Sequence, residues 1–104
     1  MKKIYISGPI SGYTMPERIA AFAKVKNDLE GRGFLCVSPL ENGLPGNAST
    51  HEHMRRDIEL LTGCDAIFMM ERWCHSAGCK LELDIAVACG MDVVFEECGT
   101  VKFK

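Results

Sequence analysis

Two acidic residues and one loop of small polar residues are the groups in this sequence best placed to do chemistry. Glu82 follows the run His-Ser-Ala-Gly at residues 75–78, in the early turns of an expected helix that Gly90 ends. The start of a helix offers free N–H groups and the positive end of the helix dipole, so this loop can hold an anion and a nearby carboxylate is kept ionised. These residues form either an anion-binding site with a poised acid or a well-capped helix.

Asp57 is the second acid, on an expected helix that starts at Ser49 and ends at residues 62–63. Ser49 and Glu52 have the spacing of a capping box, which marks the start of a helix. At about 100° per residue, Asp57 falls about 60° around the helix from Met54, so it borders the apolar stripe. A carboxyl group in this position faces partly toward the core.

The helix that carries Glu82 has an apolar stripe of its own. Leu81, Ile85 and Ala88 recur at helical spacing, and Glu82 lies on the flank of that stripe. Each acid taken alone could be an ordinary solvated helix residue. Because both helices flank the same strand, the two carboxyl groups could also converge on one pocket.

Alternating strands and helices must position these acids. Strands are predicted at residues 2–7, 34–38, 64–70 and 93–95, with an edge strand at 100–104, and helices at about 15–29, 49–62 and 76–89. The nearly unbroken apolar run at 64–70 is typical of a parallel strand covered on both faces, and the crossovers should be right-handed. The pattern predicts one domain over residues 1–104, an α/β three-layer sandwich with a small, mainly parallel sheet of four to five strands.

Parallel sheets of this kind bind ligands at the carboxyl ends of their strands. The loops expected there are residues 7–13, 40–50 and 71–78, and all of them contain Gly, Ser or Asn. The loop at 41–50 is long enough to indicate a function. Neither Ser-Gly pair of the first loop belongs to a Walker or dinucleotide-binding motif, which argues against ATP or NAD.

Composition limits the possible partners. The chain has 104 residues with a formal net charge of −2, and its isoelectric point of about 5.9 gives no reason to expect nucleic acid or an anionic membrane. No apolar run approaches the roughly 20 residues that a membrane helix needs, and the Met-Lys-Lys start does not lead into a signal-peptide core, so we expect a cytoplasmic protein. A core this small gains from a partner, so a homodimer or larger homo-oligomer is expected.

The six cysteines do not form a disulfide framework pattern and mostly lie in apolar contexts, so free buried thiols are expected. Zinc binding by Cys74, His75, Cys79 and the histidines at positions 51 and 53 is an alternative, but the spacings fit no common zinc pattern. No metal and no cofactor are therefore expected. A lowered pKa of Cys79 near the helix start would make that thiol an alternative nucleophile to Glu82.

Four segments, in this order, resemble the nucleoside 2-deoxyribosyltransferase superfamily, and the resemblance runs across nearly the whole chain. They are Tyr-Ile-Ser-Gly-Pro-Ile-Ser-Gly at residues 5–12, Arg-Asp-Ile at 56–58, Cys-Asp-Ala-Ile at 64–67 and Ser-Ala-Gly-Cys-Lys-Leu-Glu-Leu-Asp-Ile-Ala at 76–86. The superfamily includes the 2′-deoxynucleoside 5′-monophosphate N-hydrolases and short members often associated with phages. The resemblance implies a flavodoxin-like fold and cleavage of the bond between base and deoxyribose.

The resemblance also implies roles for individual residues. Glu82 would be the nucleophile that attacks the anomeric carbon and forms a glycosyl-enzyme intermediate. Asp57 would be the acid that assists departure of the base, and Tyr5 would orient Glu82 through its hydroxyl group. Two carboxyl groups with opposite duties are the general logic of retaining glycoside chemistry.

The resemblance places the substrate between the first and third loops. The expected binding residues are Ser7, Gly8, Pro9, Ile10, Ser11, Ser76 and Gly78. Ser76 stands where the monophosphate hydrolases tend to carry Ser and the transferases an acid, which favours a 5′-phosphate. Ser11 stands where the hydrolases have a basic phosphate ligand, so Arg18, Arg72 or a neighbouring subunit would have to supply that charge.

The leading function is therefore hydrolysis of a deoxynucleoside monophosphate or a close nucleotide relative at its N-glycosidic bond. The alternatives are transfer of deoxyribose between bases, a non-catalytic nucleotide-binding module and a purely structural partner protein. Tyr13 could line the base site, Trp73 could stack on a base or pack against the domain, and His51 and His53 could contact substrate or cap a helix.

Overall fold

The computed structural model describes residues 2–97 and 100–103. Over these residues the chain forms β1 (Lys3–Ser7), α1 (Met15–Glu30), β2 (Leu35–Val37), α2 (Thr50–Thr62), β3 (Ala66–Met69), α3 (Ala77–Ala88), β4 (Asp92–Glu97) and β5 (Thr100–Phe103). Two short 3₁₀ helices, η1 (Pro39–Glu41) and η2 (Trp73–His75), follow β2 and β3. Each predicted strand and helix is present, with ends shifted by a few residues.

The strands form one sheet in the order β2-β1-β3-β4-β5. All neighbouring strands pair in parallel except β5, which runs antiparallel to β4 at the edge. The predicted α/β sandwich with a mainly parallel sheet and an antiparallel edge is confirmed, and the order is that of flavodoxin-like folds.

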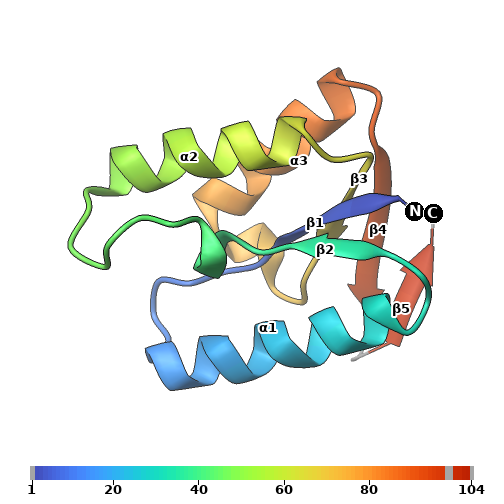
Figure 1. Ribbon diagram of the computed structural model, residues 1–104, viewed down its shortest axis with the longest axis horizontal. Coiled ribbons are helices and arrows are strands. Elements are labelled where there is room, and N and C mark those ends of the chain that lie inside the picture. Colours follow the sequence, from blue (N-terminus) through green and yellow to red (C-terminus); the bar gives the residue numbers. More distant parts are fainter. Residues whose placement is uncertain (1, 98–99, 104) are drawn as a thin grey trace.

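The three helices cover the sheet from two sides. Figure 1 shows α1 beneath the sheet and both α2 and α3 above it. The connection from β1 to β2 moves one way along the sheet, and the next two connections move the other way. Because such crossovers are right-handed, this reversal places α1 on one face and the other helices on the opposite face. The chain therefore has its switch point between β1 and β3, where ligands of such folds bind.

Alternation along β1 divides its side chains between the two faces. Ile4 and Ile6 pack with Phe22, Val25 and other residues under α1. Tyr5 belongs to the second core, with Leu61, Ile67, Cys79 and Ala86, under α2 and α3. Since Ser7 is two residues beyond Tyr5, both hydroxyl groups point to the side where α3 lies.

Side-chain caps fix the starts of the helices. Ser49 and Glu52 form the predicted capping box of α2, and Thr14 and Glu17 form another at the start of α1. Ser76 caps α3, its Oγ accepting from the N–H of Cys79 at 3.3 Å. The position of each helix start is therefore encoded locally.

The predicted apolar stripe of α3 is wrong. Its buried residues are Cys79, Glu82 and Ala86, whereas Leu81 is 44% exposed and Ala88 is also exposed. Small residues surround this helix, so apolar spacing alone did not identify the face toward the sheet. Glu82 lies in the middle of the buried face and not on its flank.

Five cysteines are described, all of them free thiols, as expected. Cys64 and Cys79 are buried and Cys36 is partly buried, but Cys74 and Cys89 are exposed, so the prediction of burial is wrong for these two. Cys98 lies outside the described residues. Across the part of the chain that is described, no helix is long and apolar enough to cross a bilayer.

Candidate active site

Glu82 is held between two hydroxyl groups from β1. The Oη of Tyr5 donates to Glu82 Oε2 at 2.7 Å, and the Oγ of Ser7 donates to Oε1 at 2.7 Å. Only 6% of Glu82 is exposed, and both hydroxyl-bearing residues are fully buried. The carboxyl group therefore has one fixed orientation, set by alternate residues of a central strand.

Burial and hydrogen bonding act on the pKa of Glu82 in opposite directions. Burial is the largest effect and raises the pKa, the hydrogen bonds from Tyr5 and Ser7 lower it, and the charge of Asp57 raises it again, leaving the pKa above its ordinary value. Glu82 is in the second turn of α3, and the helix dipole acts mainly within the first turn, so the dipole contributes little to the ionisation of this acid.

Tyr5 can serve only as a donor here. Burial and the nearby charges of Glu82 and Asp57 raise the pKa of its phenol far above the ordinary range. The phenol stays protonated at every relevant pH, so its O–H always points at Glu82.

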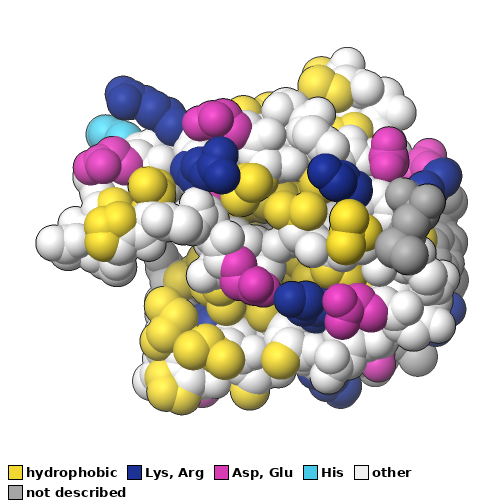
Figure 2. All heavy atoms as spheres, in the orientation of Figure 1, with side chains coloured by type: hydrophobic (Ala, Val, Ile, Leu, Met, Phe, Trp, Pro, Cys, Tyr) yellow, Lys and Arg dark blue, Asp and Glu magenta, His cyan; other side chains and the backbone are white. Residues whose placement is uncertain are grey.

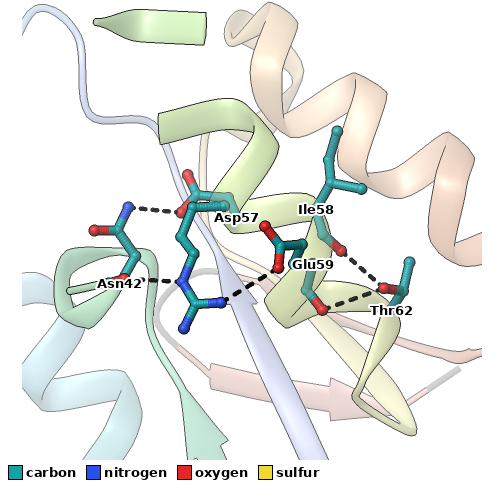
Figure 3. Close-up of polar contacts among 6 residues, drawn as sticks. Asn42, Asp57, Ile58, Glu59 and Thr62 are labelled. Carbon is teal, nitrogen blue, oxygen red and sulfur yellow. Dashed lines mark hydrogen bonds and ion pairs between the residues drawn. The ribbon is translucent and has the colours of Figure 1, made fainter. Parts of the chain in front are cut away.

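Asp57 lies at the inner side of α2, next to a buried asparagine. The Nδ2 of Asn42 donates to Asp57 Oδ1 at 3.0 Å, as Figure 3 shows. Burial raises the pKa of Asp57 above its ordinary value, and the hydrogen bond from Asn42 and the positive charge of Arg56 only partly offset that effect. Because the charge of Asp57 also acts on Glu82 and Tyr5, the two acids are within electrostatic reach of each other.

A cavity of about 310 Å³ lies between the first and third loops. Its walls are formed by Pro9, Ser11, Tyr13, Arg72, His75, Ser76, Ala77 and Gly78. The start of α3 contributes backbone N–H groups to this cavity, and Arg72 and the hydroxyl groups of Ser11 and Ser76 add polar donors. These groups together favour an anionic ligand.

The predicted loop residues divide into two groups. Pro9 and Ser11 line the cavity, whereas Ser7 is used to hold Glu82 and Gly8 is buried. A Cβ atom at Gly8 would overlap the sulfur of Met70, so glycine permits the close contact between the first loop and the end of β3.

Ile10 does not line the cavity. The exposed fraction of Ile10 is 37%, and those of Met15 and Ile19 are 52% and 56%. Met15 and Ile19 belong to the first half of α1, and Figure 2 shows hydrophobic side chains gathered over the start of that helix.

Of the two arginines considered as phosphate ligands, Arg72 is the one in the cavity wall. Its backbone has φ 68°, in the left-handed region that few non-glycine residues adopt. Arg18 is not in the cavity wall, but it contacts two residues that are: its Nη1 donates to the carbonyl of Pro9 at 2.9 Å, and its guanidinium lies 3.8 Å from the ring centre of Tyr13.

Sequence reasoning missed Asn42 and considered His75 as a possible metal ligand, not as part of a substrate cavity. Asn42 is only 5% exposed and bonds Asp57, and His75 lines the cavity. The length of the loop at 41–50 indicated a function, but nothing in it marked Asn42 as a buried amide. Tyr13, which was expected near the base, lines this cavity.

Two alternative roles lose support. Burial raises the pKa of the Cys79 thiol, so this residue is not an activated nucleophile. Trp73 packs beside Phe95, their ring centres 5.7 Å apart, which is the structural role foreseen for it. Among the described residues, no three His, Cys, Asp or Glu side chains are grouped so as to hold a metal ion.

Comparison with known proteins identifies the family and the fold of this chain. A family model described as "Domain of unknown function (DUF4406)" matches residues 2–95. No curated protein matches the chain. Among solved structures, the fold is similar to that of the 2-desoxiribosyltransferase from Leishmania mexicana, at 19% identity and a TM-score of 0.72, with all of this chain and 79% of that chain covered. The resemblance predicted from sequence is confirmed at the level of the fold.

Proposed function

Because this chain belongs to the DUF4406 family and has a deoxyribosyltransferase-like fold, we propose that it cleaves the base–deoxyribose bond of 2′-deoxynucleoside 5′-monophosphates or close nucleotide relatives. The observation that carries this proposal is the buried carboxyl group of Glu82, held by Tyr5 and Ser7. A buried carboxyl group with a hydrogen bond to each oxygen has a fixed orientation and little contact with water. Such a group is suited to attack a carbon atom and not to form a surface ion pair.

In the proposed reaction, one oxygen of ionised Glu82 attacks the anomeric carbon as the bond from that carbon to the base breaks. The bonding electrons leave with the base nitrogen, and the base takes a proton from Asp57. Water then attacks the same carbon and gives its proton to the Asp57 carboxylate, which releases 2-deoxyribose 5-phosphate and restores Glu82.

Burial raises the pKa of both acids, so it is their hydrogen bonds that differ. Tyr5 and Ser7 donate to both oxygens of Glu82 and stabilise the ionised form that the nucleophile requires. Among the described residues, Asp57 accepts one side-chain hydrogen bond, from Asn42, and its raised pKa favours the protonated form that an acid catalyst requires. Since the two groups influence each other, their titration belongs to the pair.

The cavity between the first and third loops is the proposed phosphate site. Arg72 would supply the positive charge that Ser11 lacks, and Ser76 and Gly78 place the start of α3 against the phosphate. The hydroxyl group of Ser76 accepts from the N–H of Cys79 and keeps its own proton to donate.

Transfer of deoxyribose to a second base is the alternative reaction, because it uses the same intermediate with a base in place of water. Adding a second free base to the reaction and looking for a new nucleotide separates the two. A binding module without catalysis would be stabilised by nucleotides but would release no base.

The test is a panel of deoxynucleoside monophosphates, with free base measured by chromatography. Glu82→Ala should abolish release, while Asp84→Ala, which changes an exposed acid on the same helix, should leave it intact. Base release by Glu82→Ala at the native rate would rule out the proposed nucleophile.

A further inference from the structure

Asn42 has every hydrogen-bonding group of its side chain occupied. Its Nδ2 donates to Asp57 Oδ1 at 3.0 Å and lies 3.0 Å from His53 Nδ1, and its Oδ1 accepts from the N–H of Leu44 at 3.0 Å. Its backbone carbonyl also accepts from the Nε of Arg56 at 3.1 Å. One buried amide thus joins the loop after β2 to the inner face of α2.

The orientation of this amide is fixed by the backbone. A flipped amide would place its NH₂ group against the N–H of Leu44, so Oδ1 must face Leu44 and Nδ2 must face Asp57 and His53. Since Nδ2 has only protons to offer, His53 Nδ1 must be the acceptor and the ring proton must be on Nε2.

We propose that Asn42 and His53 are positioning residues for the acid Asp57, an inference that rests on the proposed function. The amide holds Asp57 Oδ1 as an acceptor and leaves Oδ2, which receives no hydrogen bond from any described residue, to carry the proton toward the base. As that proton leaves, negative charge develops on Asp57, and the N–H of Asn42 is already in place to stabilise it. His53 keeps the amide turned toward Asp57 by accepting its second proton.

Other ionisable groups face Asp57 besides this pair. Arg56 lies on the same helix, and Glu82 from α3 and Tyr5 from β1 are near enough to feel its charge. The amide of Asn42 and the protonated phenol of Tyr5 carry no charge. A change at Asn42 therefore alters how Asp57 is held while the other charges stay in place.

The first test uses Asn42→Asp, which keeps an oxygen to accept from Leu44 but replaces the donor to Asp57 by an acceptor. Base release is measured from 2′-deoxyguanosine 5′-monophosphate, whose base needs a proton to leave, and from its 7-methyl derivative, whose cationic base does not. We expect a loss of about tenfold or more with the first substrate and less than about twofold with the second. Asn47→Asp, an exposed change in the same loop, should behave as the native protein.

The pH profile gives a second readout. A carboxylate beside Asp57 raises the pKa of that acid, so the alkaline limb of the rate should move to higher pH in Asn42→Asp. Damage confined to loop packing would instead lower the rate with both substrates and at every pH, and that result would overturn the inference. If the native protein releases base from neither substrate, the proposed function fails and this inference fails with it.

Variants of His53 test the other half of the pair without changing Asn42 itself. His53→Leu removes the acceptor and should slow release from deoxyguanosine monophosphate about fivefold, while His53→Asn, whose oxygen takes the place of Nδ1, should restore most of the rate. His51→Leu, which changes an exposed histidine two residues earlier on the same helix, serves as the control. Equal rates for the Leu and Asn variants would show that His53 does not position the acid.

Discussion

The carboxyl group of Glu82 carries a cost to folding as well as a role in chemistry. Burial makes its ionised form unfavourable, and the hydroxyl groups of Tyr5 and Ser7 offset only part of that effect, since its pKa stays raised. An acid whose pKa is raised by folding stabilises the folded state while it is protonated, and this contribution is lost as the acid ionises. Such a trade between stability and activity is common at active sites.

Glu82→Gln should therefore change how stability depends on pH. Because the folded pKa of Glu82 lies above its ordinary value of 4.5, the native protein keeps this contribution below that value and loses it as pH rises toward the raised pKa. The Gln variant does not ionise, so the melting temperature of the variant minus that of the native protein should increase as pH rises. Thermal unfolding between pH 4 and 8 measures this, with the exposed Asp84→Asn as control; a difference that does not vary with pH would contradict it.

Tyr5→Phe should impair activity through Glu82. It removes the donor to Oε2 and leaves that oxygen buried without its partner, an interaction of about 1.5–3 kcal/mol for a charged acceptor. We expect kcat to fall by about 10- to 100-fold and the acid limb of the pH profile to move to higher pH, because the pKa of Glu82 loses one of the contacts that lower it. Steady-state kinetics across pH measure both effects. An unchanged acid limb would mean that Tyr5 acts on folding alone.

At the scale of helices and strands, local signals predicted most of the fold. The capping box of Ser49 and Glu52 marked the start of α2, and the apolar run before Met70 marked the central strand β3. These features depend on neighbouring residues, so a single sequence contains them.

The orientation of α3 and the contacts of Asn42 were beyond such reasoning. The face of α3 that meets the sheet includes a glutamate, because two hydroxyl groups of a strand 75 and 77 residues away receive it. Asn42 is buried because the loop after η1 turns its amide onto α2. Both facts follow from tertiary contacts that hydropathy does not record.

The caps of α2 and α3 allow the two roles of Ser76 to be separated. Ser49 and Ser76 each accept from a backbone N–H three residues later, at 3.1 and 3.3 Å, so either change to Ala should cost about 1 kcal/mol of stability. Only Ser76 lines the cavity, so only Ser76→Ala should also weaken nucleotide binding. Urea unfolding and calorimetric titration give the two quantities. Equal nucleotide affinity in both variants would remove Ser76 from the phosphate site.

For the molecule as a whole, the charge balance works against an anionic ligand. The chain has a net charge of −2, and two of the carboxyl groups that contribute to it, those of Asp57 and Glu82, belong to the proposed catalytic site. Long-range attraction therefore cannot bring a phosphate to this protein, and binding must come from the local groups around the start of α3. The cavity places Arg72 there, within a wall that otherwise carries no Lys or Arg among the described residues.

Nucleotide binding should consequently raise the free energy of unfolding, and much of this effect should depend on Arg72. A ligand at a hundredfold its Kd adds about 2.7 kcal/mol to folding, which for a chain of this length is a rise in Tm of about 10 °C or more. We expect this rise with a deoxynucleoside monophosphate, little with the nucleoside, and a reduced rise in Arg72→Ala. Lys80→Ala, which removes an exposed cation from the first turns of α3 outside the cavity wall, should respond as the native protein. Equal stabilisation by nucleoside and nucleotide would show that the cavity does not recognise phosphate.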